Sequence, residues 1–209
     1  MARGRFISLE GGEGVGKSTQ LTALAAALQG RGIDVLVTRE PGGSPGAEAI
    51  RELLLQGDEQ RWSAGAEALL FAAARADHVD KTIRPALARG QWVLSDRFVD
   101  SSLAYQGEAG GLGIDRVRDL HRFATNDFLP DRTLVLALAE AEASARARAR
   151  DGNLGDRIGA RPPSYHAAVE AGFRAIASRE GDRVRIVDAD GSAATVTARL
   201  LYALADLMP

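Results

Sequence analysis

A glycine-rich segment at residues 11–18 has the spacing of a phosphate-binding loop. Its sequence, GGEGVGKS, fits the pattern G-x-x-x-x-G-K-S/T, although an ordinary glycine-rich turn would share part of that composition. Glycines let successive backbone N–H groups converge on phosphate oxygens, a lysine can reach the β- and γ-phosphates, and a serine hydroxyl can ligate Mg²⁺. The segment therefore predicts phosphoryl transfer from a bound nucleoside triphosphate. The residues predicted to contact the phosphates are Gly11, Gly12, Glu13, Gly14, Val15, Gly16, Lys17, Ser18 and Thr19.

Charged side chains follow two other apolar runs of the chain. Arg39 follows one run, and Asp96 and Arg97 follow another. Ligands of open α/β sheets bind at the carboxyl ends of the strands, so we expect these side chains beside the glycine-rich loop. Asp96 could hold Mg²⁺ together with Ser18, and planar guanidinium groups suit phosphate. A solvated charge at a strand end is the alternative for each residue taken alone.

The elements that position these residues alternate between strand and helix patterns. A strand at 6–10 precedes the glycine-rich loop and a helix at 18–29 follows it, which is the context that a phosphate-binding loop requires. The alternation predicts an α/β fold, with a parallel β-sheet of about five strands surrounded by helices. Further strands are expected at 33–38, 91–95, 132–138 and 183–188. Further helices are expected at 46–56, 64–89, 101–107, 114–127, 139–150, 164–180 and 192–207.

The composition narrows the possible functions. The chain has 209 residues and a formal net charge of −2, so nothing indicates a general electrostatic grip on nucleic acid or an anionic membrane. It has no cysteine, which excludes disulfides, thiolate nucleophiles and cysteine-based zinc sites. No apolar run approaches the roughly 20 residues that span a bilayer, and we find no signal peptide. No linker divides the chain, so a single domain at 1–209 is expected.

Three motifs together resemble the bacterial thymidylate kinase family of P-loop nucleoside monophosphate kinases. They are the glycine-rich loop, the sequence TREPGG at 38–43, and the sequence DRFVDSSLAYQG at 96–107. Their order and spacing match the family over about residues 4–140, and the C-terminal part matches more loosely. The resemblance implies a P-loop nucleotide kinase fold with a short lid, and the transfer of a phosphoryl group from Mg-ATP to dTMP in dTTP biosynthesis. It also implies a cytosolic homodimer.

The resemblance also implies how dTMP is bound. Arg39 and Arg97 would clamp its phosphate, and Glu13 would accept a hydrogen bond from the deoxyribose 3′-OH. Phe71 would stack on thymine and Arg75 would donate to its exocyclic oxygen. Spacing alone makes Phe71 a core residue, since it ends an apolar run.

A polar cluster after Asp96–Arg97 completes this set. By resemblance, Tyr105 would pack against the 2′ face of the sugar and disfavour ribonucleotides. Ser101, Ser102 and Gln106 would line the pocket, with Ser102 closer to the base. Such a cluster could equally cap a helix, and capping alone would account for Ser101.

A segment at about 151–163 is rich in glycine, proline and charge, and is predicted to be the lid. Some family members carry an arginine in the phosphate loop, where this chain has Gly14, and members without it usually supply an arginine from the lid. Arg150 and Arg157 are the candidates, whereas Arg146 and Arg148 fit an exposed helix face at least as well. The residues predicted to be catalytic are Lys17, Asp96, Arg97, Arg150 and Arg157.

The lid departs from the family pattern after Arg157. The glutamate that usually follows is missing, and Pro162 and Pro163 interrupt the segment. Which lid arginine contacts phosphate therefore stays open.

Three other functions are alternatives to this one. Another nucleotide or deoxynucleoside kinase on the same fold would differ in the residues that recognise base and sugar. A GTPase would carry the guanine-binding sequence N-K-x-D, which is absent. A binding module without activity is disfavoured by the complete set of Lys17, Ser18, Asp96 and lid arginines.

Overall fold

The protein contains one sheet of five strands in the order β2-β3-β1-β4-β5. The computed structural model describes residues 3–58, 60–139, 141–143, 145–146 and 157–209. All four strand pairings are parallel, so the predicted parallel sheet of about five strands is confirmed. The strands are β1 (Phe6–Glu10), β2 (Val35–Arg39), β3 (Trp92–Asp96), β4 (Arg132–Ala137) and β5 (Val184–Asp188).

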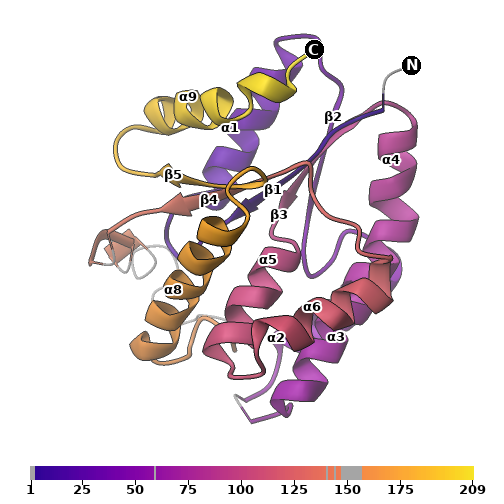
Figure 1. Cartoon of the computed structure of the whole chain (residues 1–209), viewed down its shortest axis with the longest axis vertical. Coiled ribbons are helices and arrows are strands. Elements are labelled where there is room, and N and C mark those ends of the chain that lie inside the picture. The colour runs from indigo at the N-terminus through magenta and orange to yellow at the C-terminus, as the bar shows by residue number, and fades with distance from the viewer. Residues whose placement is uncertain (1–2, 59, 140, 144, 147–156) are drawn as a thin grey trace.

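Helices cover both faces of the sheet (Figure 1). On one face lie α1 (Lys17–Gln29) and α9 (Ala193–Ala203), which is followed by a short 3₁₀ segment, η3 (Ala205–Leu207). The remaining helical elements are α2 (Pro45–Leu55), α3 (Ala64–His78), η1 (Val79–Ile83), α4 (Arg84–Ala88), α5 (Val99–Ser102), η2 (Leu103–Ala109), α6 (Ile114–Thr125) and α8 (Pro163–Arg179). Within the described ranges, no helix is long and apolar enough to cross a membrane.

Two hydrophobic cores lie on the two faces because side chains alternate along each strand. In β1, Ile7 packs with the core beneath α1 and α9, whereas Phe6 packs with the core that η1, η2 and α8 share. In β3, Leu94 packs with the first of these cores and Val93 with the second. The inner strands β1, β3 and β4 are therefore buried on both faces, whereas the edge strands β2 and β5 are partly exposed.

Helix boundaries differ from the expected ones where local chemistry intervenes. The helix expected at 64–89 is formed by α3, η1 and α4, with a π-helical segment in the middle. The two prolines that interrupt the predicted lid mark the start of α8 instead. Pro162 is its N-cap and Pro163 its first residue, where a fixed φ and a missing N–H carry no penalty.

The region before α8 is described only in part. Of the helix expected at 139–150, residues 141–143 and 145–146 are helical, and 140, 144 and 147–150 lie outside the described residues. Residues 151–156 of the predicted lid also lie outside them.

Candidate active site

The carboxyl ends of β1, β2 and β3 meet at one edge of the sheet. Leu9 of β1 and Arg39 of β2 both lie in register with Asp96 of β3. A cavity of about 450 Å³ opens beside this edge, a volume typical of a small-molecule site. The predicted charges at the strand ends therefore lie next to the glycine-rich loop.

The cavity wall has an excess of positive charge. Its described lining contains six cationic side chains and three carboxylates, an environment that favours an anionic ligand. The cationic side chains are Lys17, Arg39, Arg51, Arg75, Arg97 and Arg146.

The glycine-rich loop has the shape of a phosphate cradle. Gly16 has a φ of 92°, in the left-handed region, and serves as the N-cap of α1, whose positive dipole end therefore points into the loop. The Lys17 Nζ atom donates to the carbonyl oxygens of Gly11 (3.0 Å) and Gly12 (2.6 Å). Burial, together with Arg97, lowers the pKa of Lys17 to about 8. A bound phosphate would restore the charge of this lysine by compensating both effects.

Ser18 and Asp96 form a pair of oxygen ligands at the start of α1. The Ser18 hydroxyl lies 3.5 Å from Asp96 Oδ2. The other oxygen, Asp96 Oδ1, is buried and has no hydrogen-bond partner among the described residues. The described residues contain no cluster of three or more metal-binding side chains, but Mg²⁺ at nucleotide sites needs only one or two protein oxygens beside the substrate phosphates. The pair therefore fits Mg²⁺.

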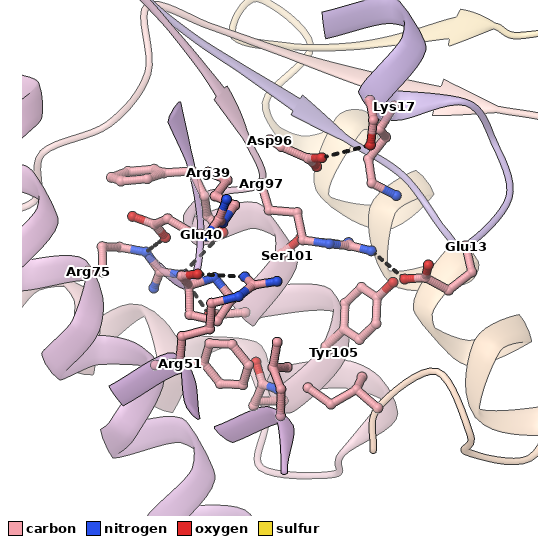
Figure 2. A pocket seen from close by; sticks show the side chains of 18 of the residues that line it. Glu13, Lys17, Arg39, Glu40, Arg51, Arg75, Asp96, Arg97, Ser101 and Tyr105 are labelled. Carbon is pink, nitrogen blue, oxygen red and sulfur yellow. Dashed lines mark hydrogen bonds and ion pairs between the residues drawn. The ribbon is translucent and has the colours of Figure 1, made fainter. Parts of the chain in front are cut away.

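Arg97 sits in a strained turn between β3 and α5. Its φ is 70°, which is unusual for a residue with a side chain and recurs at functional sites. Its guanidinium group donates to Glu13 Oε1 (2.6 Å), the carbonyl of Gly11 (3.1 Å) and Ser101 Oγ (3.1 Å). Two of these bonds join the guanidinium group to the glycine-rich loop, and Figure 2 shows it reaching toward Glu13 beside Tyr105.

Glu10, the last residue of β1, forms hydrogen bonds with the residues that follow this turn, a role that sequence reasoning missed. It is fully buried and accepts hydrogen bonds from the Phe98 N–H (2.7 Å) and from the hydroxyls of Ser101 (2.5 Å) and Ser8 (2.8 Å). Burial, and next the charge of Asp100, raise the pKa of Glu10 to about 7. The only feature of the sequence that could have indicated its role is its position, as a charged residue at the end of an apolar strand directly before the glycine-rich loop.

A buried network orients Arg75 at the other end of the cavity (Figure 2). Arg75 donates through Nε to Glu40 Oε2 (2.7 Å) and through Nη2 to Ser102 Oγ (2.9 Å). Glu40 Oε1 lies 3.0 Å from His78 Nδ1, and His78 Nε2 lies 2.7 Å from Thr38 Oγ1. Burial alone would raise the pKa of Glu40, but Arg75 and His78 hold it below its usual value. Sequence reasoning assigned no role to Glu40 or His78.

Four other predicted residues line the same cavity. Phe71 is half-buried, lines the cavity and also packs against the core. The Tyr105 ring lies 4.9 Å from the Arg97 guanidinium, and burial raises the pKa of its hydroxyl to about 12. Gln106 donates to Glu67 (2.9 Å). Arg39 pairs with Glu48 at the rim.

The serines of α5 do not cap it. The helix has no side-chain cap, and Ser101 and Ser102 are instead bonded to Arg97 and Arg75. The capping alternative is therefore wrong for both.

Several arginines lie elsewhere than expected. Arg157 is buried against Glu67 and is absent from the described wall of the cavity. Arg146, which fitted an exposed face, does line it, and is also paired with Glu142. Arg150 lies outside the described residues. Arg51, which was not predicted, lines the cavity and donates to the carbonyl of Pro41 (2.7 Å).

Three members of the glycine-rich loop face away from the cavity. Val15 packs into the core beneath α1, and a second cavity behind the loop is lined by Gly11, Gly12 and Val15. Gly14, Gly16, Ser18 and Thr19 line the first cavity.

Comparisons with known proteins agree with one another. The family model of thymidylate kinase matches residues 9–200. A thymidylate kinase of Rhizorhabdus wittichii is 58% identical over 99% of this chain and 99% of its own length, and one of Afipia carboxidovorans is 50% identical over 95% of this chain and 87% of its own. The crystal structure of thymidylate kinase from Ehrlichia chaffeensis has a TM-score of 0.77 and 29% identity, and covers 97% of this chain and 99% of its own.

Proposed function

This chain belongs to the thymidylate kinase family and phosphorylates dTMP, and we propose that it does so with Mg-ATP bound on the loop at 11–18. The observation that carries the proposal is that one cavity joins the phosphate cradle to the pocket around Arg75. The product, dTDP, serves dTTP biosynthesis. The whole chain acts as a single kinase domain.

ATP is proposed to lie with its phosphates on the loop. Lys17 leaves the carbonyls of Gly11 and Gly12 to contact the β- and γ-phosphates, and backbone N–H groups supply the remaining donors. Ser18 and Asp96 hold Mg²⁺ or its waters. When bound, Mg²⁺ neutralises charge that develops on the phosphate oxygens.

dTMP is proposed to occupy the half of the cavity between Arg97 and Arg75. Arg97 and Arg39 bind its phosphate, and the phosphate then competes with Glu13 for Arg97. Glu13 can in exchange accept a hydrogen bond from the sugar 3′-OH. This exchange explains why a carboxylate lies beside the site of two anions.

The base is proposed to stack on Phe71 and to accept a hydrogen bond from Arg75. Ser102 and Gln106 line its edge, and Tyr105 packs against the sugar. The buried carboxylate of Glu40 binds Arg75 Nε, and the Phe98 carbonyl (3.2 Å) and Ser102 Oγ (2.9 Å) accept from Nη2, so Nη1 is the group proposed to donate to the base. The phosphate of dTMP is itself the nucleophile and needs no general base, so the enzyme contributes mainly position and positive charge.

Positive charge at the transferred group is proposed to come from Lys17, Arg97 and a lid arginine. Arg146 is favoured for the last role, because it already lines the cavity. Arg150 stays a candidate. We do not propose a catalytic role for Arg157, because it is bound to a buried carboxylate away from the loop.

A homodimer in the cytoplasm is proposed as the working form. Support for the dimer comes from Leu69 of α3 and Phe123 of α6, two exposed apolar side chains on helices that pack together. The cytoplasmic location is supported by the reaction, because its nucleotide substrates are cytoplasmic metabolites. The proposed partners are dTMP, ATP and a second copy of the chain, and they include neither a nucleic acid nor a membrane.

The base preference can be measured with a panel of acceptors. We expect ADP release with Mg-ATP and dTMP to exceed that with dUMP, dCMP or GMP by about tenfold or more. A pocket that hydrogen-bonds thymine leaves polar groups unpaired with cytosine or guanine, whereas uracil keeps those hydrogen bonds and lacks only the methyl group, which is worth about tenfold or more in an apolar pocket. A coupled assay that follows ADP checks this. Equal turnover with another monophosphate would show that the site belongs to a different nucleotide kinase.

Binding of Mg-ATP is expected to weaken about tenfold between about pH 8 and pH 9.5. The pKa of Lys17 is about 8 before nucleotide binds, so the lysine loses its charge, and its attraction for phosphate, as the pH rises through this value. Glu10 has a pKa of about 7 and is already ionised over this range, so it does not contribute. Calorimetry in two buffers of different ionisation enthalpy should show proton uptake on binding at about pH 9. The Lys17→Met variant, as control, should show none, and the same uptake in that variant would assign the proton to another group.

A further inference from the structure

A buried carboxylate on α3 has no part in the roles assigned so far. Glu67 is 3% exposed and lies one helical turn before Phe71, outside the wall of the cavity that its neighbours line. An isolated carboxylate at such a position would be strongly unfavourable, so its partners indicate its purpose.

Those partners come from two distant parts of the chain. Glu67 Oε2 accepts a hydrogen bond from Arg157 (2.5 Å) and another from Arg161 (2.7 Å), which both belong to the segment just before α8. The other oxygen, Oε1, accepts the amide of Gln106 (2.9 Å), which lines the cavity. One carboxylate therefore joins the segment before α8 to the acceptor pocket.

Further bonds attach the same segment around this carboxylate. Arg157 donates through Nε to the carbonyl of Leu54 at the end of α2 (2.9 Å). Arg161 lies over the Tyr165 ring, with its guanidinium 4.5 Å from the centroid, and the Tyr165 hydroxyl donates to the carbonyl of Tyr105 (2.8 Å). Leu54 and Tyr105 belong to the helices on either side of the acceptor pocket.

Ile158 lies between these anchors. It follows Arg157 directly, is 9% exposed, packs into the core that Tyr105 shares, and forms part of the cavity wall together with Phe71 and Gln106. The Ile158 side chain carries no polar group, so the hydrogen bonds of the flanking Arg157 and Arg161 side chains contribute to holding it in that wall, beside the backbone bond from the Arg161 N–H to the Ile158 carbonyl (3.2 Å).

We propose that Glu67 is a positioning residue for the acceptor pocket, holding Ile158 in its wall through Arg157 and Arg161 and holding Gln106 at its edge. This deepens the proposed function, on which it rests. Without the carboxylate, two guanidinium groups would lie buried side by side with like charge, so the segment would leave the wall. The position of Arg161, which the sequence left without a role, follows from this anchor.

The test is Glu67→Gln, which keeps the size of the side chain and removes its charge. We expect the KM for dTMP to rise about tenfold while the KM for ATP stays within about twofold, because the loss of position is confined to the acceptor half. Glu52→Gln, an exposed change on α2, is the matched control and should leave both values unaltered. Circular dichroism and melting curves show whether each variant folds.

A second variant separates positioning from general stability. Arg161→Met keeps the length of the stem, and in combination with Glu67→Gln it removes one of the two unpaired charges. The double variant should therefore have a KM for dTMP no higher than that of Glu67→Gln alone. If the double variant raises the KM for dTMP by the product of the two single-variant increases, the inference is wrong. It is also wrong if Glu67→Gln lowers only the fraction of active enzyme and leaves the KM for dTMP unaltered. Failure of the unaltered enzyme to phosphorylate dTMP would instead overturn the proposed function.

Discussion

Replacing Lys17 with methionine is expected to lower kcat by about 10³-fold or more. Lys17 is the only cation within the loop, because the neighbouring glycine at position 14 supplies no charge. Phosphoryl transfer depends on positive charge at the transferred group, and a hydrophobic side chain of similar length removes that charge without leaving a void. Steady-state kinetics with saturating Mg-ATP and dTMP measures the change.

The fold should survive this substitution. Lys17 is 8% exposed and its lowered pKa shows that burial disfavours its charge, so a methionine should melt at the same temperature or higher. Phe71→Ala is the companion variant and should mainly raise the KM for dTMP, because Phe71 lines the acceptor half. If both variants showed a similar fall in kcat together with a similar rise in KM for dTMP, the separate roles of these residues would be contradicted.

Replacing Asp96 with asparagine is expected to lower kcat by about 10²- to 10³-fold at low Mg²⁺. One Asp96 oxygen is buried without a hydrogen-bond partner among the described residues, which leaves it available to Mg²⁺ or its waters. An amide keeps the shape and the contact with Ser18 but has no negative charge for the cation. A titration of activity against Mg²⁺ should show the half-saturating concentration moved upward.

The matched control is Asp80→Asn. Asp80 is 73% exposed on η1, where its pair with Arg84 contributes little, so kinetics and Mg²⁺ dependence should stay unaltered. A fall in kcat for Asp96→Asn that is the same at every Mg²⁺ concentration would show that Asp96 acts on Arg97 or Ser18 rather than on the metal.

Local features could be predicted because they depend on neighbouring residues. The strand–loop–helix at 6–29 follows from an apolar run, glycines at required positions and apolar residues at helical spacing, all within one short segment. The five strands were located to within about two residues because each contains a short cluster of apolar residues between turn or helix signals, although only the three inner strands are buried on both faces. The rule that ligands bind at the carboxyl ends of strands then placed Arg39, Asp96 and Arg97 correctly at one edge of the sheet.

The partners of the buried charges could not be predicted. Arg75 pairs with Glu40 across 35 residues, and Arg157 with Glu67 across 90. Periodicity indicates that a position is buried, but the partner of a buried charge depends on which helices pack together. The sequence alone could therefore neither distinguish Arg146 from Arg157 as a lining residue nor assign any role to Glu67.

The sequence by itself thus determined the parallel sheet, the phosphate-binding loop and the chemistry available at the strand ends, since these arise from local pattern and from the handed geometry of βαβ units. Only the tertiary structure decided which side chains share the cavity, and which carboxylates hold its arginines in place. The physical reason is that a buried ion must be matched by another buried group, and the match is made by packing between segments far apart in the chain. The glycine-rich loop borders a cavity around which three buried carboxylates form hydrogen bonds: Glu10 with the Phe98 N–H, Glu40 with Arg75 and Glu67 with Gln106.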